Sequence, residues 1–215
     1  MQAIIDNLPL YWTGFRTTLV LTVVSAVFAT LLGTVLGAFR VSPIPVLRAF
    51  GTWYVEMLRN TPLTLVFFFF VFVAPQIGLQ IPFFASALVA LSLYTAAFVC
   101  EAVRSGVNSV GVGQAEAARA IGLSFGQSLS LIVLPQAFRT VVPPLINIFI
   151  ALTKNTSIAA GFFVTELTAV GIRLANANPA SVIAVLLGVA GFYLLITIPA
   201  GIFAGRLERK VAFAR

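Results

Sequence analysis

Two short polar segments interrupt long apolar stretches of this chain, and their side chains are the ones best suited to hold a charged solute. Each segment places a cation before an amide and a hydroxyl, a combination that suits a carboxylate because charge-assisted hydrogen bonds are strong. Ionisable groups inside apolar segments are costly and are therefore candidates for function. The segments consist of Arg59, Asn60 and Thr61 and of Lys154, Asn155, Thr156 and Ser157. They predict a solute pathway or binding site, in which Glu56, one helical turn before Arg59, can meet an ammonium group.

A structural role is the alternative for the same charges. Glu56 and Arg59 are three residues apart, and so are Glu101 and Arg104, so each pair can neutralise itself along one helix. Lys154 can bind carbonyl groups of its own helix. The sequence leaves both interpretations open.

The composition places these residues in a membrane protein. Hydrophobic residues make up 60 % of the 215 residues, charged residues make up 9 %, and the mean hydropathy is +1.07. Soluble domains are about 25 % charged. The composition therefore excludes a disordered chain, a nucleic-acid module and an ordinary cytosolic enzyme, and it fits lipid as the main solvent. The chain has no histidine, which removes His-based metal sites, and Cys100 is expected to be a small packing residue.

Five apolar segments are long enough to cross a bilayer as helices, which takes about 20 residues each. The predicted fold is an all-α membrane protein, a single transmembrane domain over residues 1–215 with spans at about 17–39, 49–74, 83–103, 141–164 and 181–204. The second span has two alternative starts, near residue 49 or near residue 61. Residues 1–15 are expected to form a short interfacial segment, not a signal peptide, with Tyr11 and Trp12 at the membrane surface.

The lysines and arginines predict which side of the membrane each connection faces. With five spans and an outer N-terminus, only Arg16 and Arg173 fall outside, and Lys154 lies near the midplane of its span. The C-terminus and the long polar connection at about 104–139 are then cytoplasmic, as the positive-inside rule requires. The cationic residues assigned to the cytoplasmic side are Arg40, Arg48, Arg59, Arg104, Arg119, Arg139, Arg206, Arg209, Lys210 and Arg215.

The long polar connection is predicted to form two short helices joined by a turn. Residues 114–121 are rich in alanine, a strong helix former, and Glu116 is expected in the first turn, where a carboxylate suits the helix dipole. Gly122 can adopt the left-handed conformation that ends a helix. Ser124 is a candidate N-cap of a second helix, which Pro135 is expected to stop. The small side chains would let another protein approach closely; the alternative is an amphipathic connector that rests on the membrane.

The same connection resembles the EAA loop of ABC importer permeases. The match consists of Glu116, Ala117 and Ala118, then Gly122 after three residues, then Ile132, Leu134 and Pro135. The flanking sequence, from about residue 18 to residue 204, is similar to the polar amino-acid subfamily and most of all to permeases of actinobacterial glutamate importers. The flanking motifs are Arg59-Asn60-Thr61-Pro62-Leu63, Glu101-x-x-Arg104-x-Gly106, Leu134-Pro135-Gln136-Ala137-x-Arg139 and Lys154-Asn155-Thr156-Ser157.

The resemblance implies the type I ABC importer permease fold and a pore subunit that is not an enzyme. In that family the loop is a coupling helix held in a cleft of a cytoplasmic ATPase, which implies coupling roles for Glu116, Ala117, Ala118 and Gly122. The implied partners are two ATPase subunits, a second permease subunit (a sister chain or a second copy), an extracytoplasmic solute-binding protein, membrane lipid and an amino-acid substrate, but no nucleic acid. ATP and its magnesium ion would bind the ATPases, and this chain would bind no cofactor, since it lacks a G-x-x-x-x-G-K-[ST] loop. The implied location is a bacterial plasma membrane.

The resemblance makes glutamate the expected substrate, with glutamine or another polar amino acid as the alternative. Many members of the family have aspartate at the position of Asn155, and the loss of that carboxylate favours acidic or neutral substrates over basic ones. An ion-coupled secondary transporter is the alternative of another class, and a structural membrane subunit is a third. Ion coupling predicts free intramembrane carboxylates, whereas Glu56 and Glu101 each lie near an arginine in sequence.

Overall fold

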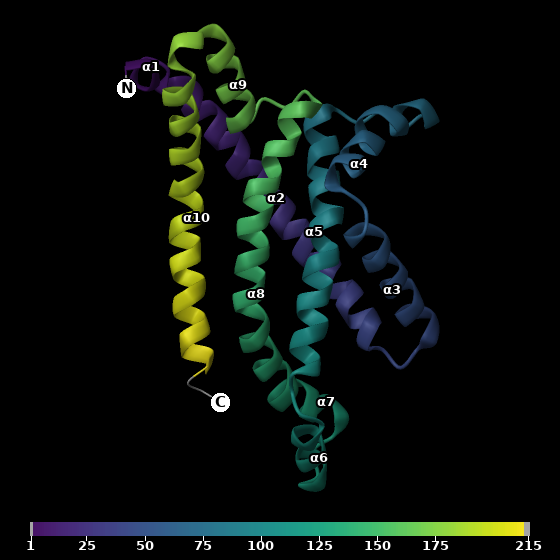
Figure 1. Ribbon diagram of the computed structural model, residues 1–215. Coiled ribbons are helices and arrows are strands. Elements are labelled where there is room, and N and C mark those ends of the chain that lie inside the picture. Colours follow the sequence, from purple (N-terminus) through teal and green to yellow (C-terminus); the bar gives the residue numbers. More distant parts are fainter. Residues whose placement is uncertain (1, 213–215) are drawn as a thin grey trace.

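The computed structural model describes residues 2–212, and the chain folds into a bundle of long helices that run side by side (Figure 1). Every regular element in that range is a helix. The helices that are long and apolar enough to cross a membrane are α2 (Leu8–Val41), α5 (Phe83–Asn108), α8 (Leu134–Asn155) with its flanking turns, and α10 (Val182–Ala212). Together with one bent helix pair, they confirm the predicted all-α membrane fold.

The predicted second span is a broken pair of helices rather than one straight helix. It consists of α3 (Pro45–Arg59), α4 (Leu63–Phe68), the π-helical stretch η1 (Phe69–Val73) and the 3-10 helix η2 (Ala74–Ile77). The two halves are bent by 100°. Pro62 explains the break, because it has no N–H to donate and disfavours a helical conformation at the residue before it. The two expected starts, near residues 49 and 61, each lie close to the beginning of one half.

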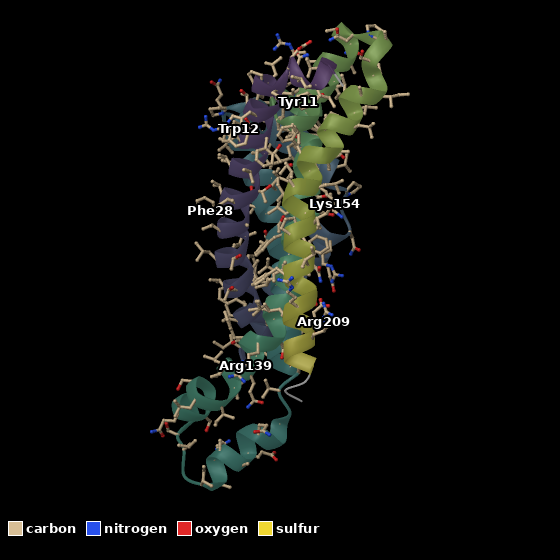
Figure 2. All side chains as sticks on the ribbon, turned by 90° about the vertical axis from the view of Figure 1, so that its left-hand side faces the viewer. Tyr11, Trp12, Phe28, Arg139, Lys154 and Arg209 are labelled. Atoms are coloured by element: carbon tan, nitrogen blue, oxygen red, sulfur yellow. The ribbon has the colours of Figure 1, made fainter. Side chains whose placement is uncertain are left out.

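The N-terminal residues pack against the bundle, and the prediction that Tyr11 lies at the membrane surface is wrong. After the short helix α1 (Gln2–Ile5), α2 begins at Leu8. Tyr11 is fully buried, and its hydroxyl donates a hydrogen bond of 3.0 Å to the carbonyl of Val185 on α10. Trp12 is 56 % exposed and lies on the outer side of the bundle (Figure 2), as expected of an aromatic residue at the membrane surface.

The sequence analysis missed helix α9, which covers one end of the bundle. α9 (Leu167–Ala177) lies in the connection between the last two predicted spans and packs against α2 and α10. The 3-10 helices η4 (Thr156–Phe162) and η5 (Pro179–Ser181) join it to α8 and α10. Its buried side chains share a small apolar core with Tyr11 and Val185. This helix was missed because it is too short to be recognised as a span.

The centre of the bundle is the crossing of α2 and α5. A Cβ atom at Gly33 of α2 would lie 2.6 Å from the Cβ atom of Val99 on α5, so only glycine permits this approach. Small residues are the usual means by which membrane helices pack closely. Cys100 is buried as a free thiol, as expected for a small packing residue.

Two of the predicted cytoplasmic cations cannot be placed. Arg215 lies outside the described residues, and so does the side chain of Lys210. Arg139 and Arg209 both lie toward the end of the bundle that carries α6 (Figure 2), and we call this end the loop end.

Candidate functional site

The polar connection extends beyond the long helices at the loop end. It contains α6 (Val112–Ala120) and α7 (Phe125–Gln127), which lie past the ends of α5 and α8 (Figures 1 and 2). α6 packs against η3 (Ser128–Val133), a π-helical stretch that follows α7. Because α6 begins at Val112, Glu116 lies in its second turn and not in the first, which corrects its predicted position near the amide end of the helix.

Gly122 ends α6 in the predicted left-handed conformation, with a φ of +89°. Its N–H donates to the carbonyl of Arg119 at 3.0 Å, and the N–H of Leu123 donates to the carbonyl of Ala118 at 3.1 Å. These two bonds form a Schellman motif, which satisfies carbonyls that a helix end leaves free. A Cβ atom at Gly122 would meet no described atom of this chain within 4 Å. The turn is therefore open to approach from outside.

Ser124 starts the second helix as predicted, but Pro135 does not end it. The Ser124 hydroxyl accepts the N–H of Gln127 at 3.3 Å, and the Ser124 N–H donates to the Gln127 side chain at 2.9 Å, which makes a capping box. The helix then passes through η3 directly into α8. Pro135 lies in the first turn of α8, after the wider π-helical stretch, where a missing N–H is tolerated. The expected stop before Pro135 is therefore wrong.

The predicted coupling residues do not share one face of the loop. Glu116, Ala117 and Gly122 are exposed, whereas Ala118 is only 4 % exposed. The first three can contact a partner directly, and Ala118 packs inside the loop.

Two apolar side chains project from the same loop. Ile121 is 80 % exposed and Val112 is 73 % exposed, one at each end of α6. Single exposed apolar residues are common on protein surfaces, but Ile121 directly precedes the exposed turn at Gly122 and is therefore a candidate for contact with a partner protein. The sequence analysis missed both residues, although an isolated isoleucine directly before the turn glycine was a visible signal.

Three arginines from different helices surround Glu101 toward the loop end. Arg40 of α2 forms an ion pair with Glu101 Oε1, and Arg59 of α3 lies 3.6 Å from the same oxygen. Arg104 lies 3.3 Å from Glu101 Oε2. The Glu101–Arg104 pair is therefore confirmed. The alternative that Glu56 and Arg59 neutralise each other is wrong for the described residues, because Arg59 reaches across to Glu101 of α5 instead.

The two predicted polar segments approach each other through one aromatic ring. The guanidinium carbon of Arg59 lies 5.7 Å from the centroid of the Phe98 ring, within the range of a cation–π interaction. Phe98 and Asn155 line the same small cavity of about 110 Å³ between α5 and α8. Glu56 lines a separate cavity beside Arg40. Phe98 is therefore a shared neighbour of Arg59 and of the cavity that Asn155 lines, whereas Glu56 lines a different cavity.

Lys154 is exposed at about mid-height of the long helices (Figure 2), and it forms no ion pair within residues 2–212. Such a cation needs water, a partner chain or a solute. The hydroxyls beside it bond their own helix: Thr156 donates to the carbonyl of Thr153 and Ser157 to that of Lys154, both at 2.7 Å. Lys154 and Asn155 therefore remain available for a solute, while the hydroxyls stabilise the change from α8 to η4.

In the other polar segment too, the hydroxyl bonds its own helix while the amide side chain remains exposed. The Thr61 hydroxyl donates to the carbonyl of Met57 at 2.7 Å, whereas Asn60 is exposed at the end of α3. Thr61 therefore has a local structural role, as Thr156 and Ser157 have.

Glu166 is a buried carboxylate that the sequence analysis missed. It accepts the Tyr193 hydroxyl at 2.9 Å, the Thr18 hydroxyl at 3.3 Å and the N–H of Ala169 at 2.9 Å. Among the described residues it has no ion pair with an arginine or lysine. The network joins the start of α9 to α2 and α10, and its long-range members could not be found from local sequence patterns.

Comparison with known proteins identifies the family. Residues 29–213 match the family of binding-protein-dependent transport system inner membrane components. The probable glutamine ABC transporter permease protein GlnM of Bacillus subtilis (strain 168) is 39 % identical, over 98 % of this chain and 97 % of the relative. The glutamate transport system permease protein GluC of Corynebacterium efficiens is 41 % identical, over 95 % of this chain and 93 % of the relative.

Solved structures agree with this result. A crystal structure of an amino acid ABC transporter with histidines matches with a TM-score of 0.90 and 26 % identity, over 97 % of both chains. An inward-facing MetNI methionine ABC transporter, at 21 % identity and a TM-score of 0.75, shares the fold over 96 % of this chain and 98 % of its own. The chain therefore belongs to the family of binding-protein-dependent transport system inner membrane components, whose members are pore subunits without enzymatic activity.

Proposed function

We propose that this chain is a permease subunit of an ATP-driven importer of polar amino acids, with glutamate as the preferred substrate. It forms half of the pore with a second permease subunit, and it works with two ATPases and an extracytoplasmic solute-binding protein. The observation that carries the proposal is the exposed turn at Gly122, held by a Schellman motif at the outer limit of a bundle of membrane helices. The names of GlnM and GluC support the amino-acid class.

The α6 loop is proposed to dock into the ATPase. Glu116, Ala117 and Gly122 offer small exposed groups, and Ile121 offers an apolar anchor. Ala118 contributes by packing α6 onto η3. Because the loop is continuous with α8 through η3, a movement of the docked loop is transmitted directly to the helix that carries Lys154.

The solute pathway is proposed to run past Lys154, Asn155, Arg59 and Asn60. The cations and amides suit the two carboxylates of glutamate. Among the described residues no carboxylate lines the Phe98 cavity, which Asn155 helps to line, and Arg59 lies against the Phe98 ring, so this region favours an acidic or neutral solute over a basic one. Thr61, Thr156 and Ser157 shape the helix ends in this pathway, and Glu56 lies toward the loop end, where it could meet an ammonium group during release.

The loop end is proposed to face the cytoplasm of a bacterial cell, with the N-terminus outside. Arg40 and Arg104 lie toward this end beside Glu101, and Arg139 and Arg209 lie there as well (Figure 2). An excess of arginine at one end of a membrane bundle favours the cytoplasmic side. ATP and its magnesium ion then bind the partner ATPases at this end and not this chain.

The test is uptake by the transporter reconstituted in liposomes with its ATPase and binding protein. We expect ATP-dependent uptake of glutamate, in preference to glutamine and arginine, and loss of that uptake when Lys154 is changed to alanine. Preference for glutamine would correct the substrate while keeping the class. Uptake driven by an ion gradient without ATP would contradict the proposed class and favour a secondary transporter.

A further inference from the structure

An open cavity of about 530 Å³ lies toward the loop end, between the last turn of α2, one face of α3 from Pro45 to Glu56, and α5. Three of its lining side chains are arginines that come from all three helices. The polar and aromatic residues that line it are Arg40, Arg48, Thr52, Trp53, Glu56 and Arg104. Its lining therefore combines three cations with a single carboxylate.

The positive charge of the cavity is only partly compensated. Glu101 is shared between Arg40, Arg59 and Arg104, so one carboxylate faces three guanidinium groups. The Nε atom of Arg104 is buried and has no hydrogen-bond partner among the described residues. Buried polar atoms usually have a partner, and this orphan donor lies on a residue that lines the cavity.

Arg48 lines the cavity and is held by the turn before α3. Its Nη1 atom donates to the carbonyls of Ser42 at 3.0 Å and Pro43 at 3.1 Å. These bonds occupy one nitrogen of the guanidinium, whose remaining N–H groups can hold an anion. Arg48 forms no ion pair within the described part of the chain.

The surface next to the cavity is apolar. Val46, Phe50 and Trp53 of α3 are all exposed, although each is a large hydrophobic residue. A free phosphate ion would gain nothing from them, whereas acyl chains would cover them. Basic pockets between membrane helices on the cytoplasmic side are suited to anionic lipid headgroups.

We propose that this cavity binds the phosphate group of an anionic phospholipid, with the acyl chains lying along the exposed apolar side chains of α3. The inference rests on the proposed orientation, in which the loop end lies at the cytoplasmic leaflet, and its test needs no transport. Arg48 and Arg104 donate to the phosphate, and Trp53 lies beside the glycerol and upper acyl region.

Quenching of Trp53 by brominated lipid tests the proposal directly. The chain contains two tryptophans, so Trp12→Phe leaves Trp53 as the only reporter. The purified full chain is placed in nanodiscs with equal mole fractions of brominated phosphatidylglycerol or brominated phosphatidylcholine. We expect stronger quenching by phosphatidylglycerol. Arg48→Gln should lower this preference about fivefold, the effect of one arginine near an anionic headgroup, and Arg48→Lys should retain part of it.

Two further variants test whether the charge within the cavity determines the lipid preference. Glu56→Gln removes the carboxylate that opposes an anion in the cavity and should raise the preference for phosphatidylglycerol. Arg16→Gln, an exposed arginine on α2 far along the helix from Arg40, should leave the preference unchanged.

Three results would overturn the proposal. The first is equal quenching by both lipids, and the second is an Arg48→Gln preference equal to that of the parent. The third is loss of the preference on adding millimolar inorganic phosphate, which would assign the cavity to a free phosphate ion instead of a lipid.

Discussion

The two ends of the bundle differ in whether their charged groups are compensated and their apolar groups are buried. At the loop end, Glu101 lies among three arginines, and Ile121 is exposed to solvent. At the other end, Glu166 and Tyr11 are fully buried and are satisfied by neutral donors and acceptors. Uncompensated charge and exposed apolar surface suit a contact with partners, whereas buried hydrogen-bond networks hold helices in place.

Because of this difference, substitutions at the two ends are expected to affect different properties of the protein. Changes in the α6 loop should impair transport with little loss of stability. Changes at the α9 end should lower stability first. The predictions below separate the two ends, from the largest expected effect to the smallest.

The largest effect is expected from Gly122→Glu. The added Cβ atom would meet no described atom of this chain within 4 Å, so the side chain would extend from the open turn toward a docked partner, and glutamate is strained at a positive φ. We expect ATP-driven uptake to fall about ten- to a hundredfold, the range of typical coupling free energies, while the strain lowers the melting temperature of the isolated chain by only a few degrees.

Gly122→Asn separates the two causes. Asparagine tolerates the left-handed conformation, so it keeps the turn and adds a shorter side chain. An intermediate loss of uptake is expected. Normal substrate-stimulated ATP hydrolysis and uptake in Gly122→Glu would show that this turn does not couple ATP hydrolysis to transport.

Glu166→Ala should cause the largest loss of stability. It leaves the Tyr193 and Thr18 hydroxyls and the Ala169 N–H without their acceptor, and each unsatisfied buried group costs about 1–3 kcal/mol. A total near 3 kcal/mol is expected in denaturant unfolding of the purified chain, and Glu166→Gln should lose less. Glu208→Ala is the control, because this exposed carboxylate accepts a single long hydrogen bond among the described residues, from Asn147 at 3.3 Å. Equal losses for Glu166→Ala and Glu208→Ala would contradict the structural role of Glu166.

Glu101→Gln is expected to cost about 2 kcal/mol, between the values for exposed and buried ion pairs, because the Glu101 side chain is partly exposed. It leaves three arginines without their shared carboxylate. Adding Arg40→Gln should restore part of the stability, as expected for residues in one network. Additive losses of stability in the double variant would contradict an interaction between Glu101 and Arg40.

Tyr11→Phe should have the smallest effect, about 1 kcal/mol for one buried hydrogen bond, because the ring remains and only the bond to Val185 is lost. Tyr94→Phe is the matched control, since the Tyr94 hydroxyl forms no hydrogen bond with the described residues. Loss of stability in both variants to the same extent would show that the Val185 bond contributes nothing.

Local and composition-based features of the fold could be predicted from the sequence. A helix of about 20 apolar residues is recognised by its length alone, and Gly122 was identified because a left-handed helix end favours glycine. α9 was missed because eleven residues give no span signal. The continuation through Pro135 was missed because a π-helical stretch, which absorbs the proline, has no sequence signature.

The pairings within the site were harder to predict. The i,i+3 rule found the Glu101–Arg104 pair but assigned Arg59 to Glu56, because it considers one helix at a time and Glu101 reaches Arg59 from another. Glu166 was missed for the same reason: its partners Thr18 and Tyr193 come from other helices. Which charges meet depends on how the helices pack.

The most direct test of the central claim is site-specific cross-linking to the ATPase. In a Cys100→Ala background, the only thiol is introduced either at Ala117 in the exposed loop or at Trp12 at the opposite end. With a thiol–amine cross-linker in the assembled transporter, we predict a product with the ATPase from Ala117→Cys and none from Trp12→Cys. An ATPase product from Trp12→Cys, or none from Ala117→Cys, would contradict the assignment of the loop end as the docking surface.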